Sequence, residues 1–406
     1  MTRDVREQVD QLGPVDAILI GGDIAFKADP QEYVAAMEWI RQLVEVSGCH
    51  LERVYVVPGN HDVDRAVVRG SQSVRNAHAA IHNAQHDRRE AVLRAQFEDP
   101  DTGGALLKPL AAYNDFAKVF NCQIYSPDRL YWKQTLPLEN GVRLRLNGIT
   151  STILSGTDGN DDKRMGLYLS PMQTGLDPED DVVNLVIAHH PPDWCMDHDE
   201  IEQDLNDRAA IHLFGHKHRQ MAVLADRHIR IGAAAVNPDR YEAGFEPGYN
   251  LIDLAVIGEG KDRLLDVQVH MRHLQRNPEQ YRPRLNGNDQ IFRRQISIPG
   301  RQSKAVTPHA AIDDSTSLRG SGFVAKVSTQ SDVEIAMSDE SARNLVYRFW
   351  RLTISQRREI AKKLGILEAG EMSLPEPERY GRALQRVGER NLLDKLAIEV
   401  AIMENK

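Results

Sequence analysis

The sequence predicts an α/β domain followed by a small all-α domain. Several short apolar runs in the first 300 residues end in turn-prone tips, which is typical of buried strands in an α/β sheet. The last part of the chain, about 65 residues long, instead spaces its apolar residues as a helix does. At 406 residues the chain exceeds one typical domain, and its 41% of hydrophobic residues is enough for an ordinary soluble core.

Four of the apolar runs carry metal-capable side chains at their ends. The runs span residues 15–20, 53–57, 182–188 and 209–214. Their tips read Gly22-Asp23, Gly59-Asn60-His61-Asp62, His189-His190-Pro191-Pro192 and Gly215-His216-Lys217-His218. Ligand sites in α/β sheets gather beyond the carboxyl ends of the strands, so we expect the four tips to converge.

The remaining segments complete this domain organisation. Residues 30–47 have the spacing of a crossover helix between the first two strands, and residues 64–130 look like a helical insertion. Further strands are expected at residues 142–149, 221–225, 229–236, 249–256 and 264–269. The chain is therefore expected to form an α/β domain at 1–300, a linker at 301–340 rich in Ser, Thr, Gly, Asp and Ala, and a helical bundle at 341–406.

Composition limits the classes of function. A net charge of −9 argues against a broad surface for polyanions, although bound metal ions can make a small site positive. The three cysteines are widely spaced, which fits a reducing compartment. The amino-terminal residues are polar rather than signal-like, and no apolar run approaches the roughly 20 residues that span a bilayer. We therefore expect a cytoplasmic protein with no membrane contact, of bacterial style.

The residue types at the four tips suit the hydrolysis of a phosphate ester. This reaction needs acidified water, neutralisation of charge on the phosphate oxygens, and a proton for the leaving alkoxide. Two divalent ions bridged by a carboxylate can meet the first two needs. A mixture of oxygen ligands and imidazoles suits Mn, Fe or Zn, whereas carboxylates alone would favour Mg or Ca.

The order of the tips resembles the calcineurin-like metallophosphoesterase family, whose motifs are GD, GNH[DE], a His before x-Pro, and GHxH. The resemblance covers residues 10–270, and four motifs in this order are very specific. It implies a two-sheet α/β sandwich flanked by helices, with two metal ions at the strand tips. It also implies that Asp23 bridges the ions, that Asn60, His189 and His216 bind the second ion, and that His218 binds the first. His189 is preferred to His190 because of the H-x-P spacing.

The same resemblance implies the reaction and its proton donor. His61 would face the substrate as general acid or oxyanion stabiliser rather than bind metal. The protein would be a hydrolase in which metal-bound hydroxide, with Mn²⁺ as the expected ion, attacks a phosphodiester or phosphomonoester. Family habit favours a nucleotide or nucleic acid over a phosphoprotein as the substrate.

One departure from the family pattern matters. The family opens with D-x-H at the end of its first strand, but none of Asp4, Asp10 and Asp16 has a His two places on. Asp226-x-His228 fits the letters and is expected to be a hairpin tip instead. The first metal would lose two ligands, and the fold would lose a central strand, leaving an unpaired sheet edge or a gap in the core. We expect that this chain begins late; the alternative is a genuine loss, with a one-metal site or an inactive enzyme.

The carboxy-terminal segment suggests a second kind of function. Residues 352–367, LTISQRREIAKKLGIL, resemble the small death-like helical adaptor domains fused to effector enzymes in bacterial conflict systems. The alternative is a bundle that buttresses the esterase or mediates self-association. Residues 341–406 are therefore expected to form an interaction module. The alternative function for the whole chain is a catalytically weak scaffold that recruits partners through this module.

Overall fold

The structure is a computed structural model, and the chain forms two compact units, Met1–Thr307 and Pro308–Lys406. It describes residues 1–125, 129–157, 161–237, 246–300, 345, 348–349, 352, 354–368, 371, 376–390 and 392–404. The linker predicted at 301–340 lies outside the described residues.

The first unit contains a six-stranded sheet in the order β3-β4-β5-β6-β8-β7. Its strands are β3 (Tyr131–Pro137), β4 (Arg143–Ile149), β5 (Val182–Ala188), β6 (Ile211–Phe214), β7 (Met221–Leu224) and β8 (Ile229–Gly232). The four middle strands run parallel, and β3 and β7 pair antiparallel at the two edges. Every residue of β5 is buried, as expected for a parallel strand that is covered on both faces.

A second β layer faces this sheet, and it is in two pieces. One piece is the parallel pair β1 (Ile18–Ile20) and β2 (Val54–Val56). The other is an antiparallel sheet of β9 (Gly248–Ile257), β10 (Leu264–Arg276), β11 (Glu279–Pro283) and β12 (Phe292–Ser297). The predicted two-sheet sandwich is therefore confirmed, but among the described strands none joins the two pieces of this layer.

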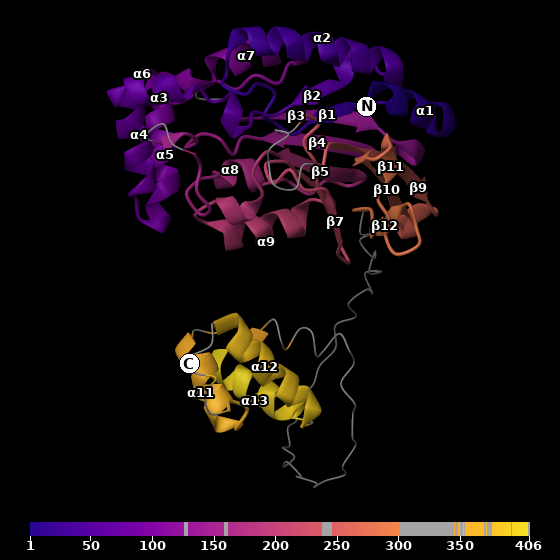
Figure 1. The fold of residues 1–406 in the computed structure, drawn as a ribbon. Coiled ribbons are helices and arrows are strands. Elements are labelled where there is room, and N and C mark those ends of the chain that lie inside the picture. The colour runs from indigo at the N-terminus through magenta and orange to yellow at the C-terminus, as the bar shows by residue number, and fades with distance from the viewer. Residues whose placement is uncertain are drawn as a thin grey trace, which may run out of the picture. The chain divides into compact units, whose positions relative to one another are not determined.

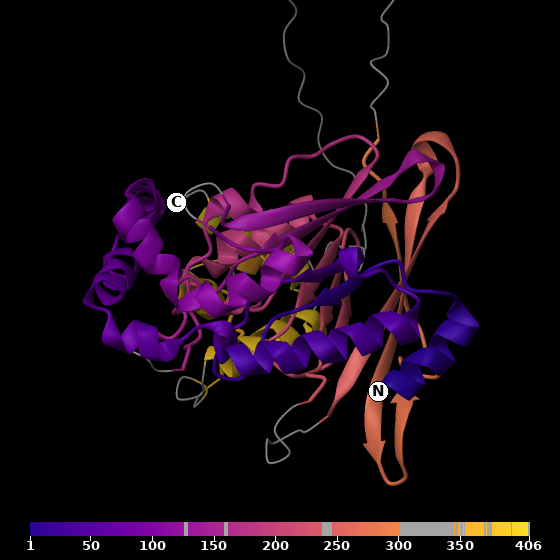
Figure 2. The same cartoon turned by 90° about the horizontal axis from the view of Figure 1, so that it is seen from above.

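Helices cover the outer faces of both layers (Figure 1). α1 (Thr2–Leu12), α2 (Pro30–Ser47) and α7 (Ala111–Ala117) lie on the side of β1 and β2, whereas α8 (Pro171–Thr174) and α9 (His198–Arg208) lie below the six-stranded sheet. Between β2 and α7 the chain forms α3 (Arg65–Gly70), α4 (Gln72–His82), α5 (Arg89–Glu98) and α6 (Pro100–Leu107). These four helices gather at the end of the unit opposite β9–β12 (Figure 2).

Local sequence explains why α2 begins and ends where it does. The Asp29 carboxylate accepts a hydrogen bond from the Gln31 amide at 2.9 Å, and Glu32 accepts one from the Asp29 amide at 3.3 Å. Together they form a capping box ahead of the helix. Gly48 then ends the helix in the left-handed conformation, with φ of 69°. The predicted crossover helix at residues 30–47 is confirmed, and it carries the chain from β1 to its parallel neighbour β2.

A buried histidine on β6 predicts an acid-sensitive fold. Burial, followed by the nearby charges of His228 and Arg230, lowers the pKa of His212 to about 3. Its ring Nε2 lies 3.0 Å from the carbonyl oxygens of Leu205 and Ala209, to which it donates. Because an unfolded histidine titrates near 6.5, the unfolded chain binds the extra proton between about pH 6.5 and 3, so stability falls as the pH drops through this window.

We therefore expect the free energy of unfolding of the wild type to fall more steeply below pH 6.5 than that of His212→Gln, which cannot take up this proton. The difference in slope should approach, at most, about 1.4 kcal/mol per pH unit. Urea titrations followed by tryptophan fluorescence at pH 7, 6 and 5 measure it. Parallel slopes for the two proteins would show that His212 does not carry the effect.

The second unit is helical in its described residues, as predicted. It contains α11 (Ile354–Lys363), α12 (Glu376–Glu389) and α13 (Leu393–Glu404). Phe349 and Tyr380 are fully buried in its core, with ring centroids 5.9 Å apart. Arg386 pairs with the buried carboxylate of Glu371 and also donates to the Ile366 carbonyl at 2.9 Å, so this ion pair ties α12 to the segment before it.

None of the helices in the described residues is both long enough and apolar enough to pass through a bilayer.

Candidate metal centre

Four loop tips meet at one edge of the first unit. Asp23 follows β1, and Asn60 opens a short 3-10 helix (Asn60–Asp62) after β2. His189 follows β5, and His216 follows β6. Because all four strands run in the same direction within their sheets, their carboxyl ends deliver these side chains to a common place.

The ring of His189 is the centre of this cluster. Its Nε2 lies 3.2 Å from Asp23 Oδ2, 3.1 Å from Asn60 Oδ1 and 3.2 Å from His216 Nδ1. His216 Nδ1 lies 3.0 Å from Asn60 Oδ1. Neighbouring ligand atoms around an ion with bonds of about 2.1 Å are themselves about 3 Å apart, so these separations suit a shared cation.

The protons in the cluster also point to a cation. His189 Nδ1 lies 2.8 Å from the Gly21 carbonyl oxygen, which can only accept a hydrogen bond. In the neutral ring the proton therefore sits on Nδ1, and Nε2 presents a lone pair to two oxygens that also present lone pairs. Only a cation or an extra proton can satisfy these facing lone pairs. The mixture of carboxylate, amide and imidazole ligands suits a divalent transition metal.

The charges of the cluster depend on one another. Burial opposes ionisation of Asp23, yet His189 lowers its pKa well below the usual range of a carboxyl group. Burial lowers the pKa of His189, but the Asp23 carboxylate outweighs it and raises that pKa. Burial and then the neighbouring His189 lower the pKa of His216 to about 4, which keeps its ring neutral and available as a ligand.

Three of the site residues have unusual backbones. Asp23, His216 and His218 are in the left-handed region, with φ of 53°, 59° and 47°. Only eight described non-glycine residues have positive φ, so three of them gather here. Such conformations cost free energy and persist where the surroundings impose them, often at functional sites.

Two glycines allow the tips to approach so closely. Gly22 has φ of 93°, and a Cβ at this position would lie 2.6 Å from His189 Nδ1. A Cβ on Gly59 would lie 2.1 Å from Asp23 Oδ1. Any side chain at either position would displace a donor of the cluster.

His61 and His218 border the same cavity as Asp23. The His61 backbone N–H donates to Asp23 Oδ1 at 2.9 Å. Its ring stacks on Phe26 at a centroid distance of 5.1 Å, and its Nδ1 lies 2.9 Å from the Phe26 carbonyl oxygen. Nδ1 therefore carries a proton, and Nε2 is the ring atom left to act on a substrate. The charge of His218 contributes to the low pKa of His216, so it too lies near the cluster.

Asp62 holds two of the tips together from behind the cluster. It is fully buried and accepts hydrogen bonds from the backbone amides of Ile24, Ala25 and Gly59 at 3.2, 3.0 and 2.8 Å. The Tyr33 hydroxyl donates to it at 2.9 Å. Burial, and then the negative charge of Asp23, raise the pKa of Asp62 to about 6.

His190 belongs to a separate buried network next to the cluster. Its Nδ1 lies 2.9 Å from Ser151 Oγ, and its Nε2 lies 3.4 Å from Asp162 Oδ2. Asp162 also accepts from Ser155 Oγ and the Gly156 amide, at 2.6 and 2.8 Å. His190 could also contribute a metal ligand, since one ring nitrogen each of His189, His190 and His216 lie within 4.8 Å of one another. No sequence pattern singles out Asp162, because it stands in a turn-rich segment without a motif.

The aspartates considered for the absent D-x-H motif lie elsewhere. Asp4 pairs with Arg272 at 2.6 Å and accepts from the Tyr249 hydroxyl at 2.5 Å. Asp226 and His228 stand at the tip of the β7–β8 hairpin, as predicted, where the Ala225 amide donates to the His228 carbonyl. The His228 ring stacks on His212 rather than on the cluster.

Comparison with known proteins agrees with these observations. A family model described as calcineurin-like phosphoesterase matches residues 2–220, and one described as GTPase-associated adaptor domain matches residues 341–402. No curated protein sequence matches the chain.

Similar solved structures include a Vps29 double mutant from Entamoeba histolytica, at 9% identity and a TM-score of 0.27, covering 73% of this chain and 89% of that one. Vps29 from Chaetomium thermophilum has 9% identity and a TM-score of 0.25, covering 72% and 89%. A candidate 5′-nucleotidase from Staphylococcus aureus, in complex with alpha-ketoglutarate, has 10% identity and a TM-score of 0.29, covering 76% and 50%. Because the phosphoesterase model spans more than half of the chain, the protein belongs to the calcineurin-like phosphoesterase family.

Proposed function

We propose that this protein hydrolyses a phosphate ester with the help of bound divalent metal ions. The observation that carries the proposal is the meeting of Asp23, Asn60 and His216 at His189 Nε2, within 3.2 Å. Membership of a phosphoesterase family supports the reaction class. We expect manganese, with iron or zinc as ions that the same donors also suit, and two ions per site in the complete family pattern.

Each residue has a role in this proposal. One carboxylate oxygen of Asp23, Oδ2, faces the cluster, and the other, Oδ1, accepts a hydrogen bond from the His61 amide. Asn60, His189 and His216 would bind the second ion of the family pattern, and His218 would bind the first. When bound, such ions neutralise charge on phosphate oxygens and make water a stronger acid. We propose a phosphodiester in a nucleotide or nucleic acid as the substrate class.

His61 is proposed as the proton donor to the leaving group. The Phe26 carbonyl oxygen accepts a hydrogen bond from His61 Nδ1, so Nε2 is the ring atom that can donate a proton to the leaving oxygen. A leaving group that is already a weak base needs little such help. The role of His61 should therefore depend on the leaving group.

We expect His61→Asn to slow hydrolysis of an alkyl or nucleoside phosphodiester by about 10²- to 10⁴-fold in kcat, the usual contribution of general acid catalysis. With bis(p-nitrophenyl) phosphate the loss should be about tenfold or less, since nitrophenolate leaves unprotonated. Steady-state kinetics on both substrates measure the contrast. His50→Asn, which changes another imidazole ahead of β2 and away from the cluster, serves as the control. Equal losses on both substrates would contradict a general acid role.

The proposed function is tested by metal removal and reloading. The purified chain would be stripped with chelator, reloaded with Mn²⁺ and assayed for bound metal and for hydrolysis of bis(p-nitrophenyl) phosphate. We expect at least one stoichiometric ion per chain and turnover that disappears on chelation. A chain that retains no Mn²⁺ and hydrolyses no phosphodiester would overturn the proposal.

A second candidate function is a scaffold that recruits partners through residues 341–406. The match of residues 341–402 to an adaptor domain favours it. The partner would be a protein or a second copy of the chain. Cellular function that survives Asp23→Asn but not removal of residues 341–406 would favour the scaffold over the hydrolase.

A further inference from the structure

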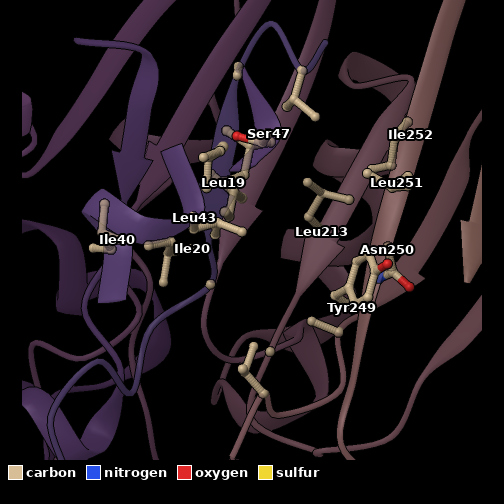
Figure 3. A pocket seen from close by; sticks show the side chains of 18 of the residues that line it. Leu19, Ile20, Ile40, Leu43, Ser47, Leu213, Tyr249, Asn250, Leu251 and Ile252 are labelled. Carbon is tan, nitrogen blue, oxygen red and sulfur yellow. The ribbon is translucent and has the colours of Figure 1, made fainter. Parts of the chain in front are cut away.

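Phe26 is an exposed aromatic residue beside the metal centre. It stands in the loop between β1 and α2, it is 62% exposed, and it lines the same cavity as Asp23 and His61. Figure 3 shows the stretch of this cavity between β1 and β9, with Leu19 on one side and Ile252 on the other. Phe26 instead borders the cavity where it meets the proposed proton donor, so its ring is accessible to a substrate bound at the metal centre.

Hydrogen bonds fix the backbone that carries this ring. The amides of Phe26 and Lys27 donate to Glu32 Oε2 at 3.0 and 2.9 Å, and the Ala25 amide donates to Asp62 at 3.0 Å. Single exposed hydrophobic residues are common and need no ligand to explain them. Phe26 differs because its position is set in advance. A ring on a fixed backbone loses little conformational freedom when a ligand packs against it, which favours binding.

One face of the Phe26 ring is covered, and the rest of the ring is open. The His61 ring stacks on it, with centroids 5.1 Å apart and an angle of 15° between the ring planes. Because a single imidazole covers only one face of a phenyl ring, the large exposed area belongs mainly to the other face and the edges. The ammonium group of Lys27 lies 5.6 Å from the centroid of the Phe26 ring. An aromatic ring with a cation beside it is the combination that binds the bases of single-stranded nucleic acids.

The position of His61 places Phe26 on the side of the leaving group. The Phe26 carbonyl oxygen accepts from His61 Nδ1 at 2.9 Å, which leaves Nε2 to protonate the leaving oxygen in the proposed reaction. The group attached to that oxygen therefore lies beside the stacked rings of His61 and Phe26. In a nucleotide substrate this group is a nucleoside, and its planar base can stack on the open part of the Phe26 ring.

The charge of the chain favours stacking over a long electrostatic contact. A net charge of −9 opposes the binding of an extended phosphate backbone. Stacking of a base on an aromatic ring does not require a positive surface. A short nucleotide substrate, held by its phosphate at the metal centre and by one stacked base, fits both observations. An aliphatic leaving group, such as glycerol, would leave the open part of the Phe26 ring uncovered.

We propose that the base of the leaving nucleoside stacks on Phe26, so that this residue selects nucleotide phosphodiesters over those with aliphatic leaving groups. The inference rests on the proposed phosphodiester hydrolysis and adds a specificity-determining residue to it. Lys27 contributes a cation to the same surface. The selection is for a base rather than for one particular base, because every base presents an aromatic face.

The test compares phosphodiesters that share their leaving oxygen and differ in a base. The full chain, loaded with Mn²⁺, is assayed with thymidylyl-thymidine and with two analogues, each of which carries hydrogen in place of one base. The products show which nucleoside leaves. We expect loss of the base on the leaving side to reduce kcat/KM by about tenfold or more, the usual effect of one stacked base. Loss of the other base should reduce it by about threefold or less.

Phe26→Leu removes the aromatic face but keeps the carbonyl that bonds His61. Its preference for a base on the leaving side should fall to about twofold or less, and Phe26→Trp should restore the preference. Tyr125→Leu is the matched control and should keep the wild-type preference. Tyr125 is also exposed, with Arg129 at 5.9 Å from its ring centroid, but it lies outside the described lining of the cavity. Equal losses on all three substrates in Phe26→Leu would show that the ring acts only through His61 and would overturn the proposal.

Equilibrium binding separates this inference from the proposed function. Replacing one bridging oxygen of the phosphodiester with a methylene group gives analogues that keep that bond intact, and calorimetry measures their Kd with and without the base on that side. We expect a ratio of about tenfold for the wild type and about twofold or less for Phe26→Leu. A chain that shows this ratio but hydrolyses no phosphodiester would contradict the proposed function and support stacking. A chain that hydrolyses all three substrates equally well, or that binds neither analogue, would overturn stacking on Phe26.

Discussion

Replacing Asp23 with asparagine is expected to reduce Mn²⁺-dependent hydrolysis of a phosphodiester by about 10³-fold or more. The change removes one negative charge from a cluster whose other donors, Asn60, His189 and His216, are neutral or cationic. It keeps an oxygen that can accept from the His61 amide. Asparagine is also one of the few residues that tolerate the left-handed backbone of Asp23, so the loss would reflect charge rather than strain. Bound manganese and kcat/KM should fall together.

The matched control is Asp181→Asn. Asp181 is also an aspartate in the left-handed region, with φ of 62°, but it pairs with Arg263 rather than with the cluster. Its replacement should leave bound metal and kcat/KM within about twofold of the wild type. Wild-type metal content in Asp23→Asn would exclude Asp23 as a ligand, and equal losses in both variants would attribute the effect to general damage.

The sequence predicted the parts of the fold in which apolar runs lead into motif-bearing tips. β1, β2, β5 and β6 all lie inside predicted runs, because buried parallel strands are continuously apolar. The meeting of Asp23, Asn60, His189 and His216 could be anticipated from the same rule, since parallel strands end at one edge. The roles of these residues, and of His61 and His218, remain proposals.

Other features could not be read from the sequence. β12, with the sequence FRRQIS, is half polar because one face is solvated, so it has no apolar run to reveal it. The helical spacing of His78, His82 and His86 in a polar stretch predicts a solvated face, and His82 and His86 are indeed exposed. His78 is only 2% exposed, because it lies with Val74, Ala77 and Ile81 on the buried face of α4. The cavity beside Asp23 is another such feature, because it follows only from how β1 and β9 pack around it.

Asp62 is expected to be the most sensitive position for stability, although it is not among the proposed ligands. Its two oxygens accept from three backbone amides and the Tyr33 hydroxyl, all inside the protein. Asp62→Ala leaves these donors without partners, and each unsatisfied buried donor costs about 1–3 kcal/mol. After relaxation we expect a net loss of about 3–5 kcal/mol. Asp62→Asn should lose only about 1–3 kcal/mol, because one oxygen remains and the Tyr33 hydroxyl can turn to accept from the new amide.

These losses should appear in urea unfolding with chelator present, where metal binding cannot contribute. Tyr33→Phe removes a single donor and should cost about 1 kcal/mol, which calibrates one hydrogen bond at this site. In the double variant with Asp62→Asn the two losses should not add, since both residues share that bond. A loss below about 1 kcal/mol for Asp62→Ala would mean that the amides of Ile24, Ala25 and Gly59 find other partners. The tips that carry Asp23 and Asn60 would then be held by the chain around them rather than by this carboxylate.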